Sequence, residues 1–145
     1  MNDLINGKPN VEFWIFGGAA LIWYLVVLVV FGGSLNLEQA DLTRMTADQQ
    51  EHLLGTPMWA TAAFGVAAIS GVLGSVLLLL TRAWAVPAFA LSAIAFVVQD
   101  IDAFVLRDAY GVMGVNSLIF QVPFLVAAII LLFYARSTRA RGWLR

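Results

Sequence analysis

The sequence has no cysteine and only one histidine, His52, among its 145 residues. The absence of cysteine excludes disulfide bonds, thiolate metal ligands and cysteine nucleophiles. A single histidine also excludes a metal site built on several imidazoles, so we predict no metal ion and no cofactor. The formal net charge is only −1. The chain therefore lacks the basic surplus that nucleic-acid binding requires, and no nucleic-acid partner is expected.

Charge is scarce as well, at 12% of residues, whereas 61% are hydrophobic and the mean hydropathy is +0.88. A soluble domain carries roughly twice that share of charged residues. The apolar residues also come in blocks of about twenty, the length that spans the hydrocarbon core of a bilayer. Residues 1–10 lack the apolar core of a secretory signal, so the first block is expected to stay as an anchor. Composition thus predicts a polytopic α-helical membrane protein with the lipid bilayer as its first partner.

Four apolar blocks predict one all-α domain over residues 1–145, an antiparallel bundle of four transmembrane helices. The expected spans are residues 13–31, 57–80, 84–106 and 115–134. Only a tight turn fits between the second and third spans, so these two form a hairpin. The polar connection at 35–55 predicts one or two short amphipathic helices on the outer membrane surface, with Thr46 and Gln49 at capping-box spacing.

The second span is unusually rich in small residues, which favour close approach of another helix in membranes. A matching stripe in the third span has the 4-3-4-3 spacing of a packing seam. We therefore predict the second span as the hub of the bundle and the third span as its first neighbour. The expected packing face consists of Ala63, Ala67, Ser70, Gly71, Gly74 and Ser75, and the matching stripe of Ala88, Ser92, Ala95, Gln99 and Asp102.

Polar side chains inside predicted spans are functional candidates, because burying them in hydrocarbon is costly. Asp100 and Asp102 lie about 9 and 12 Å from the centre of the third span, near its outer boundary. In one interpretation Asp100 pairs with Arg107 and Asp102 bonds to loop backbone; in the other, the carboxylates line an outward-facing vestibule for a cation, proton or polar solute. Gln99 and Gln121 share a depth, so they either pair or join that site. The candidate vestibule is Ser92, Gln99, Asp100, Asp102 and Gln121.

Lysine and arginine are distributed unevenly between the two sides of the predicted bundle. Two of the eight, Arg44 and Arg107, fall on the side of the long connection. Because basic residues favour the cytoplasmic side, we predict both termini in the cytoplasm. The six on that side are Lys8, Arg82, Arg136, Arg139, Arg141 and Arg145.

Several short motifs carry a family resemblance: TPMWATAAF and GVLG in the second span, the RAWAVP turn, the early LIWYL and the terminal ARSTRARGWLR. With these motifs the chain resembles a family of small bacterial inner-membrane proteins of four predicted spans. Its members are usually described as hypothetical membrane proteins or, loosely, as sugar transporters. The resemblance implies a location in the bacterial inner membrane and no catalytic residue. The family position after the glutamine of the third span is usually apolar, so Asp100 is a departure.

No hydroxyl nucleophile is flanked by a base and no phosphate-cradling loop occurs, so the sequence does not predict an enzyme. The leading hypothesis is a structural or accessory membrane protein that self-associates or docks on a larger membrane complex. The alternative is a small oligomeric transporter or channel that uses the polar vestibule. A single four-span bundle is too thin to enclose a useful solute path, so the alternative requires an oligomer.

Overall fold

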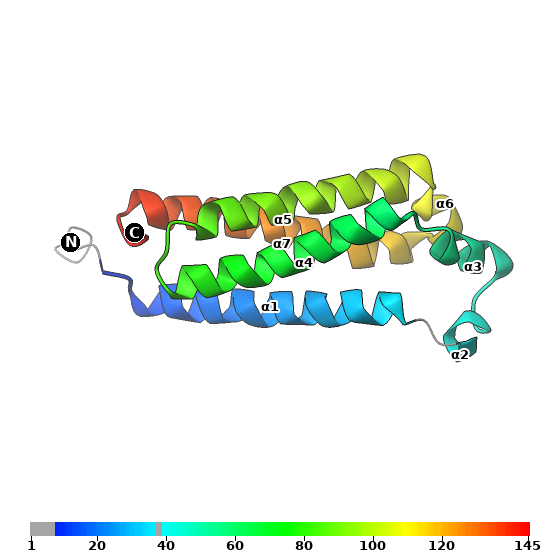
Figure 1. Cartoon of the computed structure of the whole chain (residues 1–145), viewed down its shortest axis with the longest axis horizontal. Helices are drawn as coiled ribbons and strands as arrows, with labels where there is room; N and C mark the ends of the chain where they lie inside the picture. Colours follow the sequence, from blue (N-terminus) through cyan, green and yellow to red (C-terminus); the bar gives the residue numbers. More distant parts are fainter. Residues whose placement is uncertain (1–7, 37–38) are drawn as a thin grey trace.

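A computed structural model of the chain describes residues 8–36 and 39–145. Over this part of the chain four long helices lie side by side and no strand occurs (Figure 1). Each is long and apolar enough to cross a membrane, which confirms the predicted all-α bundle. The four are α1 (Val11–Leu35), α4 (Met58–Leu79), α5 (Ala85–Asp100) with its continuation as the π-helix η2 (Ile101–Leu106), and α7 (Val115–Ala140).

The first and last helices are longer than the predicted spans. The side chain of Asn10 caps α1 by accepting a hydrogen bond from the Phe13 amide at 3.1 Å. At the other end Gly32 and Gly33 do not stop the helix, because polar side chains satisfy its last carbonyls. The Ser34 hydroxyl donates to the Phe31 carbonyl, and the side-chain amide of Asn36 donates to the Gly32 carbonyl.

Three short helices lie together at one end of the bundle, which we call the α3 end (Figure 1). They are α2 (Gln39–Leu42), α3 (Ala47–Leu54) and α6 (Ala109–Met113). The predicted capping box is confirmed, since the Thr46 hydroxyl accepts from the Gln49 amide and the Gln49 side chain accepts from the Thr46 amide. Short helices in the 35–55 connection are therefore confirmed, although residues 37–38 lie outside the described part of the chain.

The two middle helices in sequence order form the centre of the bundle. Helix α4 packs most extensively against α5 and next against α1, and α5 also packs against α7. In its most apolar stretch α4 is 44% buried and α5 39%, compared with 22% for α1 and 17% for α7. The predicted pairing of the second and third spans is thus confirmed.

The small residues of α4 are used inside the bundle. Ala67, Ser70, Gly71, Gly74 and Ser75 are buried and Ala63 is partly buried. A Cβ atom on Gly71 would overlap the ring of Tyr24 from α1, and one on Gly74 would lie 3.0 Å from the ring of Phe89 from α5. Glycine is needed at position 71 because an aromatic ring occupies the space of a side chain there.

The opposite end of the bundle, which we call the tail end, holds the α4–α5 turn and residues 141–145 (Figure 1). Gly142, with φ of +76°, ends α7 and turns the chain back. The Arg145 amide then donates to the Thr81 carbonyl, and the Ala83 amide donates to the Arg145 carbonyl, both at 2.8 Å. Trp143 and Leu144 are buried against the bundle. The tail therefore fastens the α4–α5 hairpin.

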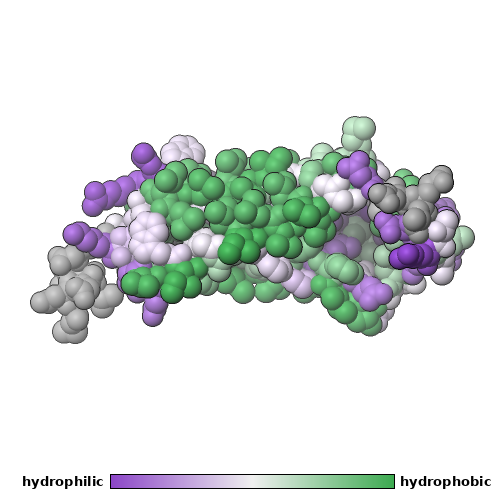
Figure 2. Space-filling view, turned by 90° about the horizontal axis from the view of Figure 1, so that it is seen from below, coloured by the Kyte–Doolittle hydropathy of each residue, from purple (hydrophilic) through white to green (hydrophobic). Residues whose placement is uncertain are grey.

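The surface of the molecule carries a broad apolar band between two more polar ends (Figure 2). Large apolar side chains of all four long helices are exposed within this band, among them Ile22, Leu73, Ile94 and Ile130. Water-exposed apolar surface of this extent is unfavourable, whereas lipid accepts it. The protein is therefore a multi-pass integral membrane protein.

Candidate functional site

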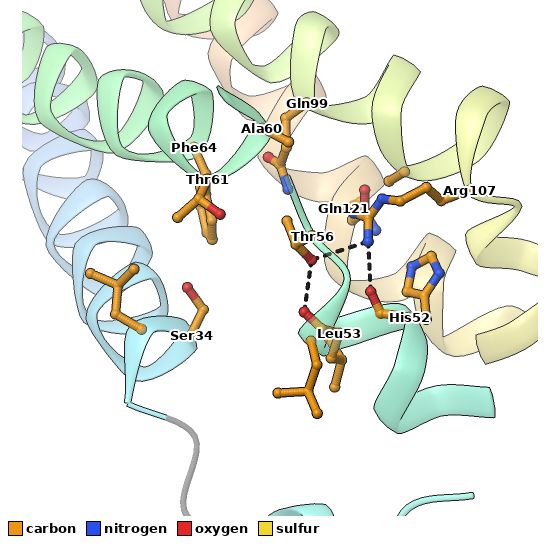
Figure 3. A pocket seen from close by; sticks show the side chains of 13 residues that line it. Ser34, His52, Leu53, Thr56, Ala60, Thr61, Phe64, Gln99, Arg107 and Gln121 are labelled. Atoms are coloured by element: carbon orange, nitrogen blue, oxygen red, sulfur yellow. Dashed lines mark hydrogen bonds between the residues drawn. The ribbon is translucent and has the colours of Figure 1, made fainter. Parts of the chain in front are cut away.

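A cavity of about 480 Å³ opens at the α3 end of the bundle. Its walls come from the end of α1, from α3, from the start of α4, from α5 with η2, and from α7 (Figure 3). This volume falls within the range of small-molecule sites in proteins. All four spans and one surface helix thus contribute to a single hollow.

Each of the four spans contributes one polar side chain to the wall of this cavity. Three residues farther toward the tail end, each span carries a phenylalanine, which places the ring about one helical turn deeper. The polar ring is Ser34, Thr61, Gln99 and Gln121. The phenylalanine floor is Phe31, Phe64, Phe96 and Phe124.

The phenylalanine floor is a connected aromatic cluster. Phe64, which itself lines the cavity, has its ring centroid 5.3 Å from Phe31, 6.3 Å from Phe96 and 6.1 Å from Phe124. Phe96 and Phe124 are 5.9 Å apart. These separations are those of packed aromatic pairs. On the tail side of the floor the interior is filled by fully buried side chains, including Tyr24, Val27, Leu78 and Phe89.

Arg107 forms part of one wall of the cavity, and its ion-pair partner Asp102 is buried behind it without lining the cavity. Both Nε and Nη2 of Arg107 lie 2.7 Å from Oδ2 of Asp102, whose side chain is only 2% exposed. Nη1 of Arg107 donates to the His52 carbonyl at 2.6 Å and to the Thr56 hydroxyl at 3.1 Å (Figure 3). Arg107 therefore fastens the end of α3 to the bundle, and Asp102 neutralises its charge.

The predicted pairing of Asp100 with Arg107, and of Asp102 with loop backbone, is wrong. It assumed 3.6 residues per turn, which places residue 107 nearly above residue 100. In the π-helix η2 a residue lies above its fifth neighbour instead, and the Arg107 amide donates to the Asp102 carbonyl at 3.0 Å. The wider turn brings Arg107 over Asp102. Neither carboxylate lines the cavity, as the vestibule interpretation required: Asp100 is partly buried and Asp102 is buried behind Arg107.

Gln99 and Gln121 face the same cavity from α5 and α7 (Figure 3). The hydrogen bond that would pair their amides is not formed, and Oε1 of Gln121 is buried without a hydrogen-bond partner. Both residues line the hollow from different helices without a hydrogen bond between them. A buried carbonyl oxygen without a donor is unusual in a folded protein and is a candidate contact for a ligand.

Ser92, the remaining predicted vestibule residue, lies on the tail side of the phenylalanine floor. Its hydroxyl donates to the Ala67 carbonyl at 2.8 Å and lies 2.9 Å from the Tyr24 hydroxyl. Since the serine proton is used by Ala67, Tyr24 is the donor in the second bond. This buried chain joins α1, α4 and α5 and is separate from the cavity.

Charge in and around the cavity is balanced. Burial, and next the positive charge of Arg107, lower the pKa of His52, which therefore stays neutral near pH 7. Arg107 is paired with Asp102, and no further charged side chain lines the cavity within residues 8–36 and 39–145. That part of the chain also holds no cluster of three or more histidine or acidic residues suited to a metal ion.

Sequence reasoning placed Gln99 and Gln121 at one depth but missed the rest of the cavity. Ser34 and Thr61 near span ends resemble ordinary interfacial residues, and Thr56 resembles a helix cap. The available signal was the repeated spacing of three between a phenylalanine and a polar residue in all four spans.

Comparison with protein-family models, with curated proteins and with solved structures finds no match for this chain.

Proposed function

We propose that this integral membrane protein is a non-catalytic accessory protein that binds a small solute in the cavity at the α3 end. The observation that carries the proposal is the polar ring of four side chains, one from each span, above the phenylalanine floor. Such a site accepts a ligand from one side of the membrane. The phenylalanine floor and the filled tail half oppose a path through a single chain.

We further propose that the α3 end faces outward and that the tail end faces the cytoplasm of a bacterial inner membrane. Arg82, Arg136, Arg139, Arg141 and Arg145 are all exposed around the tail end, whereas the α3 end has only Arg44 and the paired Arg107. This asymmetry follows the positive-inside rule. The bacterial location rests on the motif resemblance described above.

The small-residue face gives little support to docking on a larger complex, because α4 uses it within the chain. The broad exposed faces of α1 and α7 are the remaining surfaces for self-association or docking. An oligomeric transporter is the second candidate, supported by the cavity that reaches Gln99 and Gln121. Transport requires a route that leaves the cavity between copies or through an opened floor.

Cysteine accessibility tests the proposal cleanly, since the chain has no cysteine of its own. Thr61→Cys places a thiol in the cavity wall, Ser75→Cys places one in the filled half of the same helix, and Ser137→Cys places one on the exposed tail end. With a membrane-impermeant maleimide outside intact cells, only Thr61→Cys is expected to react. In inverted vesicles only Ser137→Cys is expected to react.

The outcomes separate the candidates. An unreactive Thr61→Cys from both sides contradicts a solute site, and reaction of Thr61→Cys only in inverted vesicles contradicts the orientation. Rapid labelling of Ser75→Cys, comparable with that of Thr61→Cys, indicates an open route through the bundle and favours transport.

A further inference from the structure

We infer that the ligand of the cavity is an uncharged solute that carries a carboxamide or hydroxyl group. The inference rests on the proposed function and concerns the chemistry of the same site. It depends on two properties of the cavity wall: which polar groups still have free hydrogen-bonding capacity, and whether any charge is left without a partner.

The hydroxyl groups at the cavity already donate to backbone carbonyls. Ser34 donates to Phe31 at 2.6 Å, Thr56 to Leu53 at 2.9 Å and Thr61 to Pro57 at 3.4 Å. A hydroxyl has a single proton, so these groups can offer a ligand only acceptor lone pairs. They do not determine what kind of donor binds.

The two carboxamides differ from these hydroxyls, because neither Gln99 nor Gln121 is engaged by hydrogen bonding within the described chain. Each offers two N–H donors and one carbonyl acceptor. Oε1 of Gln121 is buried and lacks a donor, which costs free energy. Rotation of this carboxamide toward the cavity that the residue lines would let a ligand supply the donor. A carboxamide or hydroxyl group matches this demand, since it donates and accepts at the same place.

The balanced charge of the wall disfavours ions. An anion that approaches Arg107 is also repelled by the carboxylate of Asp102 buried behind it, whose Oδ2 already accepts from two of the guanidinium nitrogens. A cation is repelled by Arg107, and the carboxylate of Asp102 is too deeply buried to bind it. Entry of either ion into the cavity costs desolvation that no unpaired wall charge offsets. Leu35, Leu53 and Leu54 around the mouth add apolar surface that an uncharged solute tolerates better than an ion does.

A probe series of nearly constant size tests the inference: N-acetylglycinamide is neutral, N-acetylglycine is an anion and glycylglycinamide is a cation. Each is added at millimolar concentration to the Thr61→Cys protein in lipid nanodiscs, and the rate of maleimide labelling is measured. We expect N-acetylglycinamide, and the neutral polyol erythritol as a hydroxyl probe, to slow labelling at least threefold. The two charged probes are expected to leave the rate unchanged.

Variants identify the recognising groups. Gln121→Leu in the same background is expected to abolish protection by the neutral probe. Asn116→Leu removes a carboxamide from the exposed surface of the same helix and is expected to preserve it. Equal or stronger protection by N-acetylglycine overturns the inference, because Arg107 would then be free to bind an anion.

The labelling of Thr61→Cys separates an error in the ligand chemistry from an error in the site. Normal labelling of Thr61→Cys that no probe slows overturns the inferred ligand chemistry while the cavity remains accessible. Absence of labelling overturns the proposed site itself. Protection that survives Gln121→Leu also overturns the inference, since the buried acceptor would not be the recognising group.

Discussion

The two halves of the bundle are built on different principles, although the same four helices run through both. The tail half is filled, and its helices approach closely because glycines leave room for the rings of Tyr24 and Phe89. The α3 half is hollow, and polar side chains fasten its surface helix to the spans. In the filled half the helices are held by complementary packing of side chains. In the hollow half the surface helix α3 is held by Arg107, which is paired with Asp102.

This difference also separates stability from binding. A filled interior gains dispersion and packing but leaves no room for a ligand. A hollow loses those contacts, and the loss of stability increases with its volume. The phenylalanine floor marks the boundary. Changes on its tail side are expected to affect the folding of the whole bundle, and changes on its cavity side to affect the cavity and the docking of α3.

The largest effect is expected from Gly71→Leu in the filled half. A side chain at position 71 overlaps the buried ring of Tyr24, and overpacking in a dense core typically costs about 1–3 kcal/mol or more. We expect the variant to lose most of the monodisperse folded protein in detergent, measured by size-exclusion profile and melting temperature.

Gly18→Leu is the matched control, because nothing lies within 4 Å of a Cβ atom at Gly18. Asp100→Asn provides a second comparison, since Asp100 lies outside both the packed face and the cavity. If Gly71→Leu is tolerated as well as these two, the distinction between the halves is wrong.

An intermediate effect is expected from Arg107→Met in the hollow half. The substitution leaves the carboxylate of Asp102 without its partner and frees the end of α3. Breaking a fully buried pair costs about 3–5 kcal/mol, and the partial exposure of Arg107 reduces this to about 2 kcal/mol. Hydrogen exchange is expected to accelerate in Ala47–Leu54 and to stay slow in the tail half of α4.

Arg44→Met serves as the control, since Arg44 is exposed at the same end of the bundle. Faster exchange throughout α4 as well as α3 would show that Arg107 supports the whole bundle rather than the surface helix alone.

The smallest effect is expected from Ser92→Ala, which removes one polar link from a region held mainly by shape. Membrane-buried hydrogen bonds average about 0.6 kcal/mol, and here Tyr24 also loses its acceptor. We expect melting to fall by a few degrees or less. A double-mutant cycle with Tyr24→Phe measures the coupling, and strictly additive effects would contradict the bond.

The sequence was sufficient to predict the four spans, the hairpin of α4 and α5 and the capped surface helix. These features depend on local signals: apolar length, a tight turn and the Thr46–Gln49 spacing. The small residues of α4 also indicated which helix lies at the centre. Which ring would occupy the space at Gly71 was not predictable, because it depends on the relative depth of α1.

Two other features escaped sequence reasoning for different physical reasons. The docking of Trp143 and Leu144 depends on a return of the chain to the α4–α5 turn. No hydrophobic periodicity in the sequence predicts this return. The Asp102–Arg107 pair depends on a local change of helix type, whereas angles between side chains were calculated for an α-helix. The assumption of α-helical geometry was correct for the other long helices and failed at η2, which forms part of the cavity wall.

The π-helix η2 has a mechanical consequence. If residues 101–106 rewound as an α-helix, Arg107 would stand roughly 140° around the helix axis from Asp102, since five residues at 100° each amount to 500°. The guanidinium would then leave the His52 carbonyl and the Thr56 hydroxyl together with the carboxylate. Rewinding of η2 would therefore also release the surface helix α3 from the bundle.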